Sequence, residues 1–340
     1  MKKMAYDIMA KQRHGLQIGG LYIELERTCR VPAGQLNELP AGLGNFPVFR
    51  TEDFKSGLPK DWKGYFMPMY RQEAMWIHFR RDFDANPYAA MIGAGAINAV
   101  TGEVMKHKGK DVEMILKEKQ NYIVTPPQPW LDGWKDKDGK IYQFVAAEMG
   151  SGETVEGQLT GKEEVGGIQF AVFHPVKQLI KHTMPREYIT GGSWDGYPDV
   201  GYVGEMLMEC SEPMTLGAGV MAKACAFRAR DIAPVKSIQA MGLGRGGEIQ
   251  QKIYPDPYGL EAWKKSPAEK LALYMVSPES FKQITGHPAP PTPVTYEKYQ
   301  QFGLPWFELW DKNLKDTPGA SVFSTLKTVT GKNGKKIKVG

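Results

Sequence analysis

The sequence predicts a mainly β protein, either an antiparallel β-sandwich or two β-modules, with a few short helices in the C-terminal half. Two observations support this prediction. Among 340 residues, 38 glycines and 24 prolines are scattered along the chain and divide it into short segments, as a fold of many strands and turns requires. Within those segments, apolar and polar residues alternate with the period of two that a half-buried strand shows.

The clearest strand pattern spans residues 21–26, where Leu or Ile alternates with Tyr or Glu. Residues 74–79 and 168–173 repeat the alternation, and residues 249–254 are a further candidate strand. Residues that accept a positive φ angle lie beside such runs and predict hairpin turns. These turn dipeptides are Asp138-Gly139, Gly166-Gly167 and Asn333-Gly334.

Three segments have the composition of short helices. Residues 277–286 begin with Ser-Pro-Glu, typical of an N-cap and first turn, and end at a glycine. Residues 295–303 repeat that arrangement. Residues 111–119 place apolar side chains on one side and charges on the other, as an amphipathic helix does.

The least regular stretch, residues 175–198, predicts a domain boundary. A β-rich module would then occupy residues 1–180, and a second β-rich module, carrying the short helices, would occupy residues 190–340. A single two-sheet domain is the alternative.

Composition and charge argue against several classes of protein. The net charge is only +5, and much of the excess comes from a C-terminal run of lysines, so we predict no partner nucleic acid. Asp7 and Lys11 interrupt the N-terminal segment before an apolar stretch of signal-peptide length can form. No window approaches the roughly 20 apolar residues of a spanning helix. We therefore expect a cytoplasmic protein that does not insert into membranes.

Three short segments resemble motifs for binding a cofactor or for a nucleophile, but the residues in or around each segment do not fit such a site. Residues 242–247 fit GxGxxG, but the next residues alternate like a strand and run into a proline, so no helix N-terminus would face a phosphate. We expect a glycine turn between strands there. Residues 136–141 resemble part of a calcium loop, yet Trp134 and Val145 stand where the first and last ligands belong. Residues 191–196 miss the GxSxG spacing of a nucleophilic serine by one residue.

Neither the six histidines nor the three cysteines have the spacing of metal ligands. We therefore predict no metal and no cofactor, and we expect Cys29, Cys210 and Cys225 to be reduced thiols. If the protein is an enzyme, proton transfer would come from one histidine and three carboxylates. These candidate catalytic residues are His78, Asp132, Glu148 and Glu156.

Several tryptophans lie in or beside connections rich in proline and glycine. The sequence around them does not indicate that their rings are buried in the core of a sheet. Such rings can stack on sugars, anchor partner chains or cap the ends of a sandwich. The candidate ligand or partner contacts are Trp130, Trp134, Trp194, Trp306 and Trp310.

Six strings resemble ones that recur in a broad set of uncharacterised bacterial and fungal proteins. The resemblance covers about residues 120–310, and it implies no activity, cofactor or catalytic residue. The strings are residues 128–133 (QPWLDG), 143–146 (QFVA), 155–161 (VEGQLTG), 166–169 (GGIQ), 254–258 (YPDPY) and 303–307 (GLPWF).

The function that we predict is non-catalytic: a β-rich binding or self-assembling structural protein, whose strand edges or aromatic loops contact copies of itself or a ligand. The expected partner is the chain itself, in a homo-oligomer or a larger assembly, and a glycan is the second candidate. Two alternatives stay open. One is a hydrolase with a site assembled from distant loops, and the other is a carbohydrate-binding module that uses the loop tryptophans.

Overall fold

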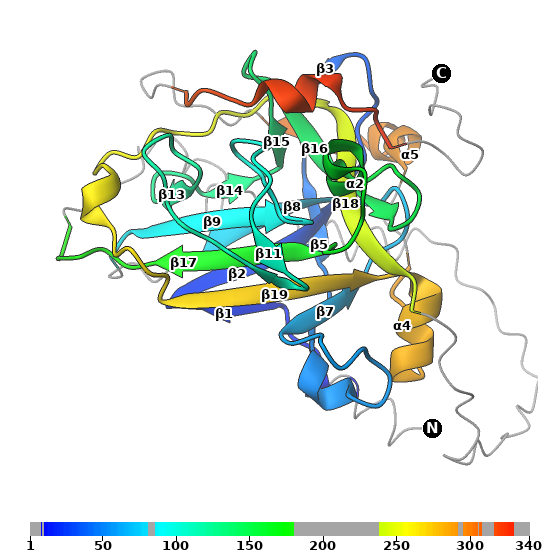
Figure 1. Cartoon of the computed structure of the whole chain (residues 1–340). Helices are drawn as coiled ribbons and strands as arrows, with labels where there is room; N and C mark the ends of the chain where they lie inside the picture. Colours follow the sequence, from blue (N-terminus) through cyan, green and yellow to red (C-terminus); the bar gives the residue numbers. More distant parts are fainter. Residues whose placement is uncertain are drawn as a thin grey trace, which may run out of the picture.

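The alternating segments of the sequence become strands of one large sheet. The computed structural model describes residues 8, 10–80, 86–179, 238–291, 295–304, 306–307 and 316–329 of the chain. Trp194, Trp310, Cys210, Cys225 and the motif at residues 191–196 lie outside these ranges. Within them the fold is mainly β, as predicted: the main sheet has 16 strands (Figure 1), and three short α-helices accompany it, two of them late in the chain.

The strands are short, and most have between two and eight residues. In chain order they are β1 (Gly15–Ile18), β2 (Leu21–Thr28), β3 (Leu36–Asn37), β4 (Leu39–Pro40), β5 (Gly42–Asn45), β6 (Phe49–Arg50), β7 (Tyr65–Pro68), β8 (Ala74–Arg80), β9 (Tyr88–Ala94), β10 (Ile97–Asn98), β11 (His107–Lys108), β12 (Asp111–Val112), β13 (Ile123–Thr125), β14 (Trp130–Leu131), β15 (Gly133–Lys135), β16 (Ile141–Glu148), β17 (Ile168–Phe173), β18 (Ala240–Ile249), β19 (Glu269–Val276) and β20 (Trp306–Phe307). The helices are α2 (Val155–Thr160), α4 (Pro278–Thr285) and α5 (Tyr296–Gln301), with 3₁₀ turns η1 (Thr51–Phe54), η3 (Leu260–Ala262) and η4 (Ser321–Thr325).

The main sheet runs in the order β1-β2-β8-β16-β18-β19-β17-β9-β10, with seven shorter strands attached at its sides. Among the described residues its pairs are antiparallel, except that β3 lies parallel to β18 and β7 lies parallel to β19. The pairings of β16 with β18 and of β17 with β19 join strands that precede residue 180 to strands that follow residue 238. The two ranges proposed as modules therefore share one sheet.

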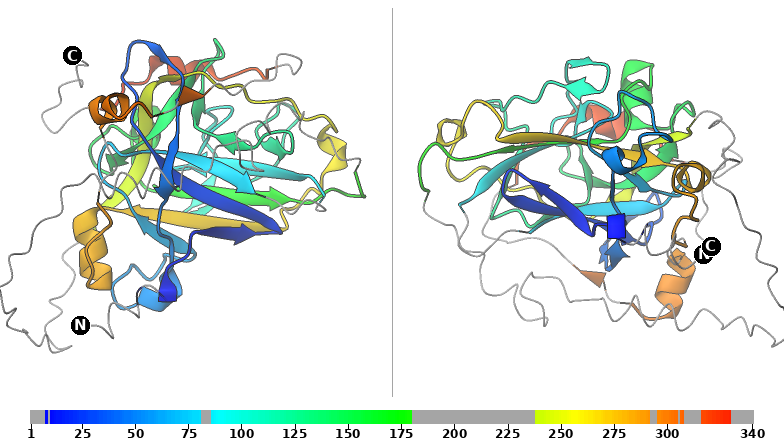
Figure 2. Two further views of the ribbon diagram at one scale, coloured as in Figure 1. Left: turned by 180° about the vertical axis from the view of Figure 1, so that it is seen from behind. Right: turned by 90° about the horizontal axis from the view of Figure 1, so that it is seen from below.

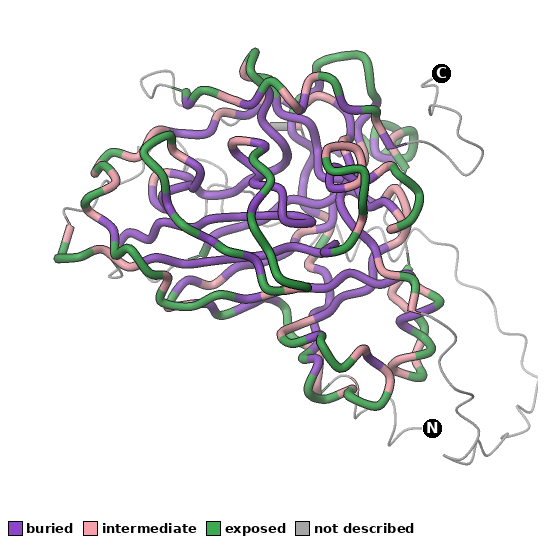
Figure 3. Tube along the Cα trace, viewed as in Figure 1, coloured by how far each residue is buried: buried purple, intermediate pink, exposed green. Residues whose placement is uncertain are grey.

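Alternate residues of the strands point to one side of the sheet and form the hydrophobic core. In β2, Leu21, Ile23 and Leu25 are fully buried, and they share one cluster with Ile77 of β8 and Phe170 of β17. The buried chain runs through the middle of the molecule, and the exposed chain is confined to connections and to the outer surface (Figure 3). In both views of Figure 2, helices α4 and α5 lie outside the strands.

Both predicted late helices are present, because local capping signals define them. The Ser277 hydroxyl accepts a hydrogen bond from the Ser280 N–H at 3.2 Å, and Gly286 ends α4 with a φ angle of 76°. Thr295 caps α5 in the same way through the Lys298 N–H. In both helices, the hydroxyl of the N-cap residue accepts a backbone N–H that has no partner within the helix.

Three sequence predictions are wrong. Residues 111–119 form no helix: after the β11–β12 hairpin the chain has no regular secondary structure, and Val112, Met114 and Leu116 are buried at a period of two. The glycines at residues 242–247 form no turn, because they lie inside β18. The strand expected at residues 249–254 is only the last residue of β18, followed by irregular chain.

Among the described residues, no helix combines the length and the apolar character needed to cross a membrane.

Candidate functional site

A cleft opens on the outward side of β17 and β19. Leu271 and Leu273 of β19 point into the core cluster, so the alternate residues Lys270, Ala272 and Tyr274 face away from it. The β11–β12 hairpin lies over this face, and together they enclose a cavity of about 340 Å³. This volume is at the lower end of the range for small-molecule sites.

Three lysines from separate parts of the chain line the cleft: Lys63 before β7, Lys110 at the tip of the hairpin, and Lys270 on β19. Two aspartates, Asp61 and Asp111, line it as well. The cationic groups therefore exceed the anionic ones by one.

Each lysine is held differently. The Lys110 ammonium donates to the Glu164 and Val165 carbonyls at 2.7 and 2.8 Å, and burial lowers its pKa. Lys270 donates to the Asp111 carboxylate at 2.8 Å. The Lys63 side chain is exposed and makes no hydrogen bond or ion pair with any other described residue.

Apolar side chains complete the walls of the cleft. Val112 and Met114 contribute from the hairpin side, and Ala272 contributes from β19. The Tyr274 ring stacks on Trp62 with centroids 4.2 Å apart, and this contact fixes the end of the cleft near Lys63. The lining can thus hold an anionic group and an apolar body at the same time.

His78, one of the predicted acid–base residues, is a buried residue of β8. Its Nδ1 is 3.0 Å from a carboxylate oxygen of Glu24 on β2, and Arg80 donates to the other oxygen at 3.1 Å. Burial would raise the pKa of Glu24, but His78 and Arg80 more than offset it, so the net shift is downward. This carboxylate orients the imidazole, as acid–base catalysts require.

Two further candidate residues, Trp130 and Asp132, lie in or directly after β14, the short strand that pairs with β8. Trp130 on β14 is the cross-strand partner of His78, and Asp132 follows two residues later. The Asp132 carboxyl accepts a hydrogen bond from the Gln251 amide, and complete burial raises its pKa well above the usual range. The structure thus places Trp130 opposite His78, two candidates that the sequence singled out separately, whereas the Asp132 carboxyl contacts Gln251.

The other two predicted acids lie elsewhere. The Glu156 carboxylate accepts the backbone N–H groups of residues 164, 165 and 166 at 2.6–2.8 Å, so it anchors the connection between α2 and β17. Glu148 ends β16 and makes no side-chain hydrogen bond with the rest of the described chain. Neither carboxylate is placed beside His78.

The expectation that Trp130 and Trp134 offer accessible rings is wrong. Their connections are short strands, β14 and β15, and the two rings are 3% and 0% exposed. Trp306 is partly buried against Tyr296 and Tyr299. Of the predicted contact tryptophans within the described ranges, only Trp306 keeps part of its ring at the surface.

The lysines of the cleft could not be found in the sequence. Lys63, Lys110 and Lys270 share no motif and are far apart along the chain, and each looks like an ordinary surface lysine. The described part of the chain contains no group of three or more His, Cys, Asp or Glu residues placed to hold a metal ion.

Comparison of the chain with protein-family models, with curated proteins and with solved structures gives no match. The function must therefore be argued from the geometry of this molecule.

Proposed function

We propose that this protein is a non-catalytic binding protein, and that it takes a small anionic ligand with an apolar body in the cleft between the β11–β12 hairpin and β19. The observation that carries the proposal is the convergence of Lys63, Lys110 and Lys270 on one cavity of about 340 Å³. Lysine ammonium groups favour carboxylate and phosphate ligands.

The contacts within the cleft leave capacity for such a ligand. An ammonium group has three N–H donors, and the two carbonyl bonds of Lys110 use two of them. Binding of an anion beside Lys110 would also relieve the unfavourable burial of this cation. The apolar walls would then contribute through the area that they remove from water.

The test is a thermal shift titration with phenyl phosphate, benzoate and inorganic phosphate. We expect phenyl phosphate to raise the melting temperature in a concentration-dependent way, and inorganic phosphate, which lacks the apolar body, to raise it less. The Lys110→Ala variant should lose the response. Lys108→Ala, on the same hairpin but outside the cavity lining, is the matched control. Equal responses in the two variants would refute the site.

A second candidate function, acid–base hydrolysis, is favoured by one specific observation: the Glu24 carboxylate lies 3.0 Å from Nδ1 of His78. A screen with chromogenic esters, phosphate esters and glycosides tests it. Activity that disappears in His78→Gln but survives in His107→Gln, a change at an exposed hairpin histidine, would support the hydrolase. No turnover of any substrate class would leave the binding function preferred.

We also propose that the long sheet folds over so that its two ends face each other as a sandwich. Supporting this, inward residues of β2 and β8 share one core cluster with those of β17 and β19. A crystal structure tests the arrangement directly, since packed sheets lie about 10 Å apart.

A further inference from the structure

Residues 316–329, which we call the C-terminal strap, lie across strands from both parts of the sheet. The strap is red in Figure 1 and contains the 3₁₀ turn η4. It joins the sheet only through isolated parallel bridges, Asp136 with Ala320 and Arg245 with Thr328. The strap is therefore not a full strand of the sheet, and most of what holds it comes from side chains.

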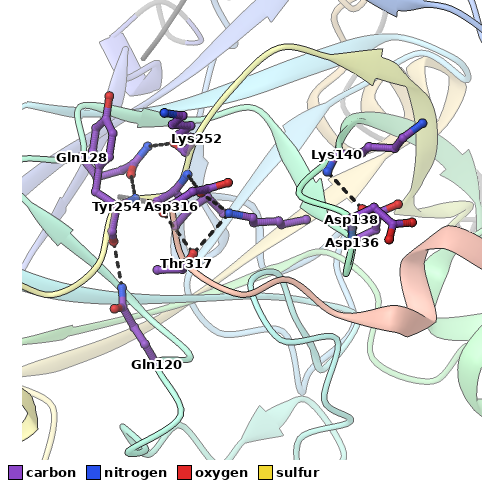
Figure 4. Close-up of polar contacts among 11 residues, drawn as sticks. Gln120, Gln128, Asp136, Asp138, Lys140, Lys252, Tyr254, Asp316 and Thr317 are labelled. Carbon is purple, nitrogen blue, oxygen red and sulfur yellow. Dashed lines mark hydrogen bonds and ion pairs between the residues drawn. The ribbon is translucent and has the colours of Figure 1, made fainter. Parts of the chain in front are cut away.

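Two polar residues, Asp316 and Thr317, fix the first end of the strap (Figure 4). The Asp316 carboxylate pairs with the ammonium of Lys135, whose side chain is 0% exposed, and also accepts the Ile253 N–H at 3.0 Å. Thr317 donates to the Ile253 carbonyl from its N–H at 2.9 Å and from its hydroxyl at 3.0 Å. Without Asp316 a buried cation would lose its partner, which is strongly unfavourable.

The second end is held through its main chain. Gln158 of α2 accepts the Lys327 N–H at 2.6 Å and donates to the Lys327 carbonyl at 3.1 Å. Arg245 of β18 donates to the Leu326 carbonyl, and Arg30 donates to the Val329 carbonyl. These side chains recognise an extended backbone and do not require a particular residue at those positions.

Between the two ends, the strap is anchored by apolar side chains at every third position. Ala320, Phe323, Leu326 and Val329 are all buried, while Ser321, Thr325 and Lys327 between them are exposed. The Phe323 ring packs on Trp134 with centroids 5.2 Å apart.

The surface beneath is shaped for this segment. A Cβ atom on Gly102 would collide with Val322, and one on Gly244 would collide with Val329. The glycines at these two positions therefore leave the space that the strap fills. A bound acidic residue, regular apolar anchors and clamped carbonyls are features of a short linear motif in a peptide-binding groove.

We propose that the strap occupies a peptide-binding groove, and that the groove accepts the strap of a second copy of this chain in place of its own. A second copy is the fitting occupant because the groove needs a carboxylate for Lys135, followed four residues later by the first of four apolar anchors. The chain itself supplies that sequence. Exchange of an identical segment between copies is a low-cost route to dimers.

The experiment uses the full chain and a fluorescent peptide of residues 316–329. The wild-type chain should bind the peptide weakly, because its own strap competes from a high effective concentration. The Phe323→Ala chain, whose own strap is weakened, should bind the wild-type peptide at least about tenfold more tightly. A peptide that carries Phe323→Ala should bind neither chain. One substitution thus has opposite effects in the two molecules, which a general loss of stability cannot produce.

Circular dichroism establishes that the Phe323→Ala chain is folded, and Leu326→Ala is the milder variant to use if it is not. A folded variant that binds the peptide no better than the wild-type chain overturns the groove. Mixing labelled wild-type and Phe323→Ala full chains should give a complex with twice the mass of one chain by light scattering. Peptide binding without this complex overturns the second copy as occupant.

Discussion

Two buried carboxylates show how the neighbours of an acid decide what it does. Among the described residues, the carboxyl of Asp132 meets the amide of Gln251 and no cation, and burial raises its pKa well above the usual range. Glu156 is also buried, but three backbone N–H groups surround its carboxylate. Asp132 therefore favours its neutral form. Glu156 instead holds the backbone of the connection between α2 and β17 through hydrogen bonds.

For Asp132 we predict a pH-dependent effect of the Asn substitution. An unfolded aspartate releases its proton near pH 4, at about 3.9, whereas folded Asp132 retains it to a much higher pH. The stability that protonated Asp132 contributes is therefore fully present below the unfolded pKa of about 3.9. It is lost as the pH rises from there through the raised folded pKa. Asp132→Asn cannot titrate, so the stability of the variant relative to the wild type should increase from pH 4 to pH 8.

Urea denaturation at pH 4, 5, 6, 7 and 8 measures this difference. Each unit of pKa elevation corresponds to about 1.4 kcal/mol. Glu148→Gln, at a partly exposed acid, is the control. Curves for Asp132→Asn and wild type that stay parallel over this range would show that Asp132 is ionised in the folded protein.

A buried thiol is the second residue-scale case. Cys29 is fully buried, and burial raises its pKa to about 12. Because the thiolate is the reactive form, Cys29 should resist iodoacetamide in the folded protein at pH 8 and react in urea. Mass spectrometry of the peptide that contains Cys29 provides the measurement, and rapid labelling without urea would contradict the burial of this thiol.

At the scale of elements, the connection from α2 to β17 depends on one side chain. Glu156 accepts the backbone N–H groups of three consecutive residues, 164–166, and they lead directly into Gly167 and β17. A glutamine would keep one acceptor oxygen and turn an NH₂ group toward a backbone donor. The connection would then lose a hydrogen bond and gain a repulsive contact.

We therefore expect Glu156→Gln to lower the free energy of unfolding by about 2 to 3 kcal/mol. Glu148→Gln, the same chemical change at the end of β16, should alter it by less than about 0.5 kcal/mol. Urea unfolding followed by circular dichroism compares the two variants. Similar losses in both would show that the three N–H contacts contribute little.

At the scale of the whole molecule, the sheet joins distant parts of the chain. Strand β16 pairs with β18 from Ile141–Ile249 to Glu148–Met241, and β17 pairs with β19 on the other side. Neither group of strands can lose its partners without exposing the same core cluster. A fold of this kind unfolds cooperatively.

We predict a single unfolding transition for strands on both sides of residue 180. Pulsed hydrogen exchange in urea, read by mass spectrometry, should show peptides from β16, β17, β18 and β19 losing protection at the same urea concentration. Earlier exchange throughout one range than throughout the other would instead indicate two independent modules.

Some of the fold is readable from local sequence, and the errors are instructive. Helix α4 was predictable because Ser277 and Gly286 cap it within the segment itself. The helix prediction for residues 111–119 was wrong because their apolar residues fit one face of a helix as well as a period of two. Only the tertiary packing selects Val112 and Met114 for burial. The cleft was not predictable, since its lysines come together only when β19 lies beside β7 and beneath the hairpin.

By itself, the sequence determined that the described chain is mainly β, that a hairpin turn forms at Asp138-Gly139, and that two short helices come late, because alternation, glycine and caps act over a few residues. The tertiary structure decided which strands pair, that Trp130 and Trp134 are buried, and which polar groups meet. His78 meets Trp130 only through strand register, and Lys135 meets Asp316 only when the strap lies in place. Such contacts join residues that are far apart in the sequence, and they form only when the complete sheet is packed. A pattern within a few residues therefore cannot predict them.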